Sequence, residues 1–234
     1  VESEIPLGAG LGSSAAVVVA GIDAATRALG EPLSAREVAQ RAFRAEFEVQ
    51  DGQASRADTF CSAMGGAVHV EGDDCARIDA PNLPFVVGFD GGAGDTGALV
   101  AGVRELKERH GFAADTVAAI GDVTREGERL LADAAGGPEE PPSPELLADL
   151  GELMDFNHGL LSAPGVSARS LDAMVWAARE AGAHGAKLTG AGGGGCIVAL
   201  DPTDETETAL SFTQGCEESF RAELATEGVR VEAE

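Results

Sequence analysis

The sequence predicts an α+β protein made of two parts that meet near Asn82. Helical patterns, with apolar residues three or four positions apart, are interrupted by short apolar or alternating runs that indicate strands. Strand and turn patterns give way to longer helical patterns near Asn82. We therefore expect one domain over residues 1–82 and a second domain over residues 83–234.

Start and stop signals separate the elements of the first part. Ser34 and Glu37 form a capping box, in which each side chain accepts a hydrogen bond from the other residue's backbone N–H. Gly30 closes the helix before this box, and Asp51-Gly52 marks the turn after the helix that follows it. The expected strands are residues 1–5 and 67–70, and the expected helices are residues 15–29, 35–48 and 55–65.

The second part is expected to contain more helix. Residues 84–89 and 196–200 are short apolar runs typical of buried strands, and a last short strand is expected over 229–231. Residues 136–144, rich in Pro, Gly and Glu, predict a flexible loop. The expected helices are residues 96–109, 115–134, 144–163, 168–181 and, as one acidic helix, 204–225.

The chain is strongly acidic, with 16 Lys+Arg against 40 Asp+Glu and a formal net charge of −24 over 234 residues. Such a surface repels phosphate backbones and anionic lipids, so we expect no nucleic-acid or membrane partner. The longest apolar run, residues 15–22, is too short to span a bilayer, and the start of the chain shows no secretion signal. The hydrophobic fraction of 44% is ordinary for a globular protein, so the acidity does not indicate disorder.

Cation and cysteine usage suggest where the protein works. Lys107 and Lys187 are the only lysines, and the other cations are arginines. Few lysines and many carboxylates suggest a halophilic protein, because concentrated salt screens self-repulsion; an acidic composition without salt adaptation is the alternative. The four cysteines lie far apart without a CxxC pair, which fits a reducing cytoplasm.

The strongest local signal is a glycine-rich loop between an expected strand and an expected helix. Its glycines allow a close backbone approach to an anion, and the helix N-terminus adds about half a positive charge. No Lys follows as in a Walker loop, and the paired serines suit Mg²⁺ or phosphate oxygens. One serine as a simple helix N-cap is the alternative. The candidate phosphate-binding residues are Gly8, Ala9, Gly10, Leu11, Gly12, Ser13 and Ser14.

A second glycine loop covers residues 190–195 and contains a literal GxGxxG. An apolar strand follows it where a dinucleotide-binding protein has a helix, so a nicotinamide-dependent oxidoreductase is disfavoured. Glycines in such number favour a backbone that passes close to a ligand or to another backbone segment. Lys187 just before the loop is a candidate phosphate contact, with a surface or carboxylate-paired lysine as the alternative.

Acidic side chains near these loops could act in catalysis. Asp58 follows Ser55 at an expected helix start, where it could accept a hydroxyl proton or simply complete a helix cap. Glu46 and Glu48, near the end of the preceding helix, are spare carboxylates that could hold Mg²⁺. Most of the glutamates must be solvated surface charge, so neither glutamate is a strong candidate by itself.

Taken together, these segments resemble the GHMP kinases, the superfamily of small-molecule kinases that includes galactokinase, homoserine kinase and mevalonate kinase. Residues 6–16 resemble the phosphate-binding motif of the family, and residues 187–196 resemble its C-terminal glycine motif in the mevalonate kinase form. Residues 155–161, 165–167 and 170–172 are similar to the helix pair before that motif. The resemblance runs over nearly the whole chain.

The resemblance implies a two-domain GHMP kinase fold, α+β, whose second domain has helices on an antiparallel sheet. It implies ATP-dependent phosphorylation of the primary hydroxyl of (R)-mevalonate in isoprenoid synthesis, with Mg²⁺ and ATP bound. By the same resemblance Asp58 is the catalytic carboxylate, Ser14 and Glu48 are Mg²⁺ ligands, and Thr96 lies near the transferred phosphate. Gly190, Gly192 and Gly193 would close over the phosphates. A homodimer is compatible with this expectation.

The chain departs from the family pattern at three points. Arg56 replaces a glycine beside the acceptor site, where it suits a carboxylate or phosphate on the substrate, and Gly97 replaces a usual basic residue. The chain also begins at Val1, inside the first domain, so we expect the family's opening strands to be absent. Phosphomevalonate kinase, another GHMP kinase, or a non-catalytic nucleotide-binding fragment therefore remain alternatives.

Overall fold

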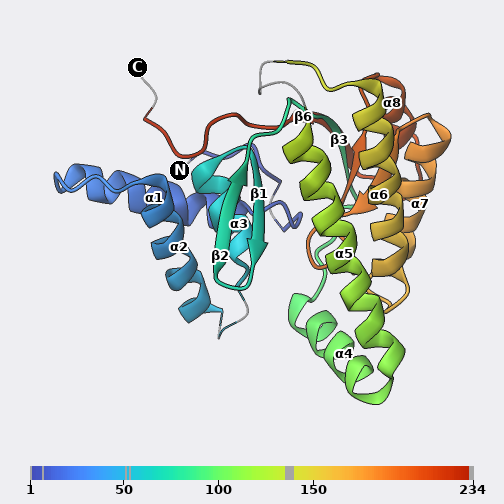
Figure 1. The fold of residues 1–234 in the computed structure, drawn as a ribbon, viewed down its shortest axis with the longest axis horizontal. Helices are drawn as coiled ribbons and strands as arrows, with labels where there is room; N and C mark the ends of the chain where they lie inside the picture. The colour runs from blue at the N-terminus through green and yellow to red at the C-terminus, as the bar shows by residue number, and fades with distance from the viewer. Residues whose placement is uncertain (1, 7, 51, 53, 135–139, 232–234) are drawn as a thin grey trace.

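A computed structural model describes residues 2–6, 8–50, 52, 54–134 and 140–231. Figure 1 shows one end of the molecule formed by the first three helices and a small hairpin, and the other end formed by longer helices on a sheet. This arrangement is α+β, with antiparallel sheets, as the sequence predicts. The predicted boundary near Asn82 falls between the hairpin and the first strand of the larger sheet.

The first end of the molecule consists of α1 (Ser13–Ala28), α2 (Ala35–Val49), α3 (Arg56–Met64) and the hairpin of β1 (Ala67–Glu71) and β2 (Asp74–Ile78). Both bonds of the predicted capping box at the start of α2 are present. Val19, Val38 and Phe60, one from each helix, are buried in a common core, which the hairpin closes with Cys75. The sequence did not predict β2, because its alternation over five residues is broken by charged side chains.

The larger sheet is fully antiparallel, with strand order β4-β5-β3-β6. Its strands are β3 (Pro84–Phe89), β4 (Gly185–Leu188), β5 (Cys196–Leu200) and β6 (Glu218–Glu223). The helices of this part are α4 (Thr96–Arg109), α5 (Gly111–Asp133), α6 (Pro144–Ser162), α7 (Arg169–Glu180) and the short α8 (Glu205–Ser211).

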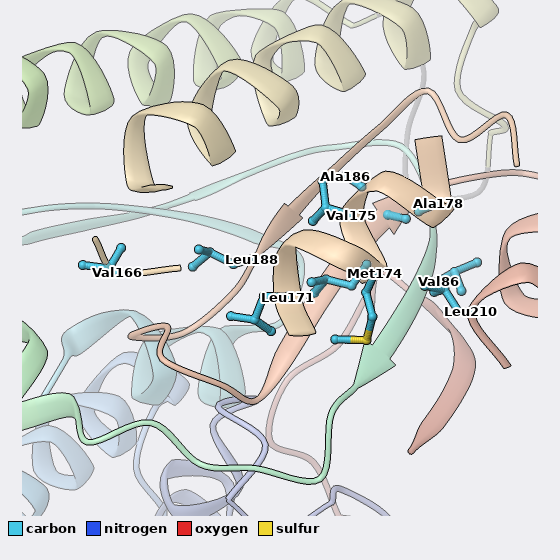
Figure 2. Packing of buried hydrophobic residues seen from close by; sticks show 11 residues of the cluster. Val86, Val166, Leu171, Met174, Val175, Ala178, Ala186, Leu188 and Leu210 are labelled. Carbon is cyan, nitrogen blue, oxygen red and sulfur yellow. The ribbon is translucent and has the colours of Figure 1, made fainter. Parts of the chain in front are cut away.

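The two faces of this sheet pack against different parts of the molecule. Val86, Ile197 and Ala199 face α7 and α8 and form the main core with Met174 and Leu210. Figure 2 shows this cluster gathered around α7, with Val86 and Leu210 toward one end and Val166 toward the other. On the opposite face, Phe85 and Leu200 pack against α5 and α6. Val87 and Val198 of the same face pack against the first glycine loop, which is thereby fixed on the sheet.

Asp155 joins α6, α7 and β4 at the segment that resembles the family's helix pair. Its Oδ1 accepts hydrogen bonds from Arg179 Nε at 2.8 Å and from the backbone N–H of Ala186 at 2.9 Å. His158, one turn further along α6, accepts a bond from the N–H of Leu188 at 3.3 Å. This segment therefore holds the strand that leads into the second glycine loop.

The end of the chain differs from the prediction. The expected helix over 204–225 is wrong, because the helix stops at Ser211 and β6 pairs with β3. Phe220 and Ala222 point toward the sheet core, a two-residue period that the charged residues Glu218, Arg221 and Glu223 obscure. The expected strand over 229–231 is also wrong. That tail crosses to the first end of the molecule, where Val229 N–H donates to Ala63 O at 3.0 Å (Figure 1).

Three further predictions differ in extent or fall partly outside the described residues. Residues 2–5 form no strand, and Val1 is not described. Helix α5 begins at Gly111, four residues before the predicted start at Asp115. The predicted loop over 136–144 lies mostly outside the described residues, and so does Asp51 of the predicted turn.

Candidate active site

A cavity of about 580 Å³ lies where the two glycine loops meet the first turns of three helices. The beginning of α1 contributes Gly12 and Ser14, the beginning of α3 contributes Ala57 and Asp58, and α4 contributes its first residue, Thr96. The remaining lining residues are Gly10, Ala15, Glu46, Gln50, Ala54, Ser55, Val100, Thr189, Gly190 and Ala191.

The first glycine loop alternates between anchoring residues and open positions. Ala9 is 1% exposed and, with Leu11, packs on the sheet face that carries Val87 and Val198. Gly10 and Gly12, between and after these anchors, line the cavity with φ of +73°. Because the left-handed conformation favours glycine and no side chain covers the backbone, an anion can approach these peptide groups closely.

The two glycine loops lie against each other. A Cβ built on Gly10 would be 3.7 Å from the Cα of Gly190, and one built on Gly195 would be 3.0 Å from the carbonyl oxygen of Ala9. Gly193 N–H donates to Val166 O at 2.8 Å, which ties the second loop to the segment before α7. The loops are far apart in the sequence, and the fold brings them to one side of the molecule.

The groups of the cavity lining that can attract an anion belong to the backbone. No lysine or arginine is among the lining residues of the described structure, whereas three helices begin at or beside the cavity. Each helix N-terminus carries about half a positive charge and unsatisfied N–H donors, so together they favour a polyanion. This arrangement suits a triphosphate in a chain whose net charge is −24.

Two carboxylates face this cavity. Glu46 is 6% exposed, and its Oε1 accepts a hydrogen bond from Ser14 Oγ at 2.7 Å. Asp58 stands beside Gly12, where a built Cβ would lie 3.5 Å from the Cβ of Asp58. Reduced hydration of the Asp58 carboxylate and then the negative charge of Glu46 raise its pKa above the ordinary value. A carboxylate with a raised pKa is a better proton acceptor.

The donor set of Ser14, Glu46 and Asp58 fits Mg²⁺. Two carboxylates that repel each other and a neighbouring hydroxyl supply the hard oxygen ligands that this ion prefers. The described residues contain no group of three or more His, Cys, Asp or Glu that could hold a metal. Mg²⁺ is usually bound through one or two carboxylates, with water and phosphate oxygens at its other positions.

Several predicted site residues lie in or beside the cavity. Gly10, Gly12, Ser14, Asp58, Thr96 and Gly190 line it. Ala9 and Leu11 act as sheet anchors, and Ser13 is the first residue of α1. Gly8 faces the side chain of Ala93. Gly192 and Gly193 do not line the cavity; they let the second loop pass close to Val166 and Leu99, where a Cβ on Gly192 would be 2.0 Å from Val166 O.

Glu48, Arg56 and Lys187 are not brought into the cavity. Glu48 is exposed and lies on the opposite side of α2 from Glu46, since two residues turn a helix by about 200°. Arg56 turns away to bind Asp73 Oδ1 at 2.5 Å and to lie 4.0 Å from the Phe43 ring centroid. Lys187 Nζ donates to Leu188 O at 2.9 Å, and burial lowers its pKa to about 8.

Of the two glutamates near the end of α2, Glu46 lines the cavity and Glu48 does not. Val38, Ala42 and Glu46 follow each other at four-residue spacing on the buried side of α2. A carboxylate on an apolar helix face is costly unless it is bound, so this periodicity was the available signal. Gln50 also lines the cavity, and nothing in the local sequence distinguishes it from a surface residue; Thr189 lines it too and stands directly before the second glycine loop.

Comparison with known proteins agrees with this geometry. The chain matches the family model "GHMP kinases N terminal domain" over residues 1–66 and "GHMP kinases C terminal" over residues 144–212. Together with the fold and the glycine-lined cavity, these matches define the class as the GHMP kinases.

Individual relatives narrow the class. The mevalonate kinase of Thermococcus onnurineus is 41% identical over 233 residues, covering 99% of this chain and 68% of that protein. The mevalonate kinase of Methanothermobacter thermautotrophicus is 41% identical over 236 residues, covering 98% and 72%. The crystal structure of L. major mevalonate kinase in complex with R-mevalonate has a TM-score of 0.72 at 26% identity, covering 93% of this chain and 67% of that one. The chain belongs to the mevalonate kinase family.

Among the described residues, no helix combines the length and the apolar character needed to cross a membrane.

Proposed function

We propose that the protein transfers the γ-phosphoryl group of ATP to the primary hydroxyl of (R)-mevalonate and forms 5-phosphomevalonate, a step of isoprenoid synthesis. One observation carries the proposal: in a chain of the mevalonate kinase family, both glycine loops and Asp58 line a single cavity. Phosphoryl transfer depends mainly on positioning and on neutralising charge, and this cavity offers backbone donors for the first and a carboxylate for the hydroxyl proton.

Each part of the cavity has a role in this proposal. The N–H groups from Gly8 to Ser14 hold the β- and γ-phosphates at the start of α1, and Gly190 of the second loop closes on them. Asp58 orients the acceptor hydroxyl and takes its proton. Thr96, whose side chain makes no hydrogen bond in the described structure, can donate to the transferred phosphate.

Mg²⁺ would be held by Ser14 and Glu46, with Glu46 in place of the predicted Glu48. The hydrogen bond between these two side chains and the burial of Glu46 support this choice. When bound, the ion neutralises charge that develops on the phosphate oxygens. Arg56 and Lys187 drop out of the proposed site because both are engaged elsewhere.

The test is an acceptor panel with the purified protein, Mg²⁺ and ATP. ADP release is followed by a coupled assay, and the product by ³¹P NMR. A new phosphate monoester that appears only with (R)-mevalonate supports the proposal. Turnover with 5-phosphomevalonate alone would assign the protein as a phosphomevalonate kinase. ATP binding by calorimetry without ADP release for any acceptor would leave a nucleotide-binding module.

Other expectations complete the proposal. The excess of carboxylates over cations, and of arginines over lysines, supports a halophilic protein. The four free cysteines support a reducing cytoplasm. The position of Asn82 between β2 and β3 supports domains over residues 1–82 and 83–234. A homodimer is supported by exposed apolar residues on α1 and α2, such as Val17 and Val49, and light scattering would measure it.

A further inference from the structure

Asp90, just after β3, lies outside the cavity but is bonded to the loop that forms its edge. Oδ1 of Asp90 accepts hydrogen bonds from the N–H groups of Gly92 and Gly195, both at 2.8 Å. Oδ2 accepts a third bond from Ser170 Oγ at 2.6 Å. The backbone N–H of Asp90 donates in return to Gly195 O at 3.0 Å. One side chain therefore joins β3, α7 and the second glycine loop.

Gly195, which Asp90 holds, also lies against Ala9 of the first glycine loop. It stands at the foot of the second loop with φ of +93°, and a Cβ built on it would be 3.0 Å from Ala9 O. Ala9 in turn is the buried anchor of the first loop. A shift of Gly195 would therefore change the spacing between the two loops that line the cavity, first at Ala9, the neighbour of the cavity-lining Gly10.

We propose that Asp90 is a positioning residue for phosphoryl transfer, which sets the separation of the two glycine loops by fixing Gly195. The expected change in kcat rests on the proposed kinase function. The expected change in ATP affinity rests on the loop geometry. The Asp90 side chain is suited to this task because one oxygen accepts from the N–H groups of both Gly92 and Gly195 while the other oxygen is held by Ser170. Small displacements in a phosphate cradle have large kinetic effects, since a shift of about 1 Å can cost about a hundredfold.

The experiment compares three variants by ATP affinity, by kcat per folded molecule and by thermal stability. Asp90→Ala should weaken ATP binding and lower kcat by about tenfold or more. Asp90→Asn should recover both values to within about threefold, because its amide oxygen still accepts from Gly92 and Gly195 while its NH₂ donates to Ser170.

Asp201→Ala is the matched control at the opposite end of β5. Asp201 is 1% exposed and accepts comparable bonds from Thr203 and Thr206, but it touches neither loop. This variant should lose stability while its ATP affinity and kcat per folded molecule stay at the wild-type values. Equal kinetic losses in Asp90→Ala and Asp201→Ala would overturn the proposal, and so would wild-type kinetics in Asp90→Ala or failure of Asp90→Asn to recover.

If Asp90→Ala does not fold, Ser170→Ala decides, because it removes only the bond that orients Oδ2. A measurable loss of ATP affinity supports the proposal, and unchanged affinity rejects it. The two hypotheses fail separately: a wild-type protein without turnover refutes the kinase function, while the ATP affinities of the variants still test the role of Asp90.

Discussion

At the scale of single residues, the environment of each carboxylate determines its task. Asp58 stands in the cavity with a raised pKa, Glu46 is bound by Ser14, and Glu48 is an exposed charge. Three acidic residues within thirteen positions of sequence therefore have different chemistry. Burial and the charge of a neighbour produce the difference, as they do in other active sites.

Asp58→Asn should lower kcat by about a hundredfold or more while ATP still binds. The same change should raise thermal stability at neutral pH. A carboxyl group whose folded pKa is raised binds protons more readily in the folded state, so its ionisation opposes folding above that pKa. The stability gain should shrink as the pH falls toward the ordinary carboxyl pKa. Calorimetry at several pH values with parallel kinetics checks both parts, and a variant with near-normal kcat would discard Asp58 as the base.

Glu46→Gln and Glu48→Gln form a matched pair on α2. Glu46→Gln should raise the Mg²⁺ concentration for half-maximal activity by about tenfold or more, because Ser14 and a neutral amide bind the ion weakly. Glu48→Gln should leave that concentration unchanged, since its side chain is exposed. Mg²⁺ titrations of both variants decide the question, and a reversed order of effects would restore the assignment made from sequence.

At the scale of elements, the glycine loops work because the sheet and the helices hold them. Ala9 and Leu11 anchor the first loop on β3, β5 and β6, and Asp155, through Ala186, holds β4 before the second. The loop sequence alone suggested phosphate binding but could not show which positions are open. Which loop positions are anchors and which are open depends on the sheet face against which the loop packs.

Comparison of Gly10→Ala with Gly30→Ala should distinguish a loss of phosphate binding from the general stability cost of backbone strain. Both glycines have a left-handed φ, +73° and +78°, so each substitution costs about 1 kcal/mol or more of stability. Gly30 has open space around its Cβ position, whereas Gly10 lines the cavity beside Gly190. Gly10→Ala alone should raise the KM for ATP. Similar KM values in the two variants would show that the first loop does not hold the phosphates.

At the scale of the whole molecule, the net charge of −24 opposes compactness and must be offset. The ion pairs of the described structure join mostly exposed side chains, such as Arg129 with Glu126, and such pairs contribute little stability. Carboxylates far outnumber the cations available to pair with them, so dissolved salt should reduce the remaining self-repulsion.

The midpoint of thermal unfolding should rise by about 5 °C or more between about 0.1 M and about 2 M KCl. Sucrose at the same osmolality is the control, because it excludes itself from the surface without screening charge. A rise in KCl that sucrose does not match supports salt adaptation. A flat or falling midpoint in KCl would leave the acidity as a property of composition alone.

The sequence by itself determined most of the elements, the two glycine loops and the family, because capping, helical periodicity and loop motifs are local signals. The Ser34 capping box and the bounds of β3 and α4 were predictable for this reason. Tertiary structure alone decided which side chains and strands contact one another. It brought Glu46 to Ser14, turned Arg56 toward Asp73, paired β6 with β3, and bonded Asp90 to the second loop. These contacts join residues far apart in the chain, and only packing determines which side chains meet.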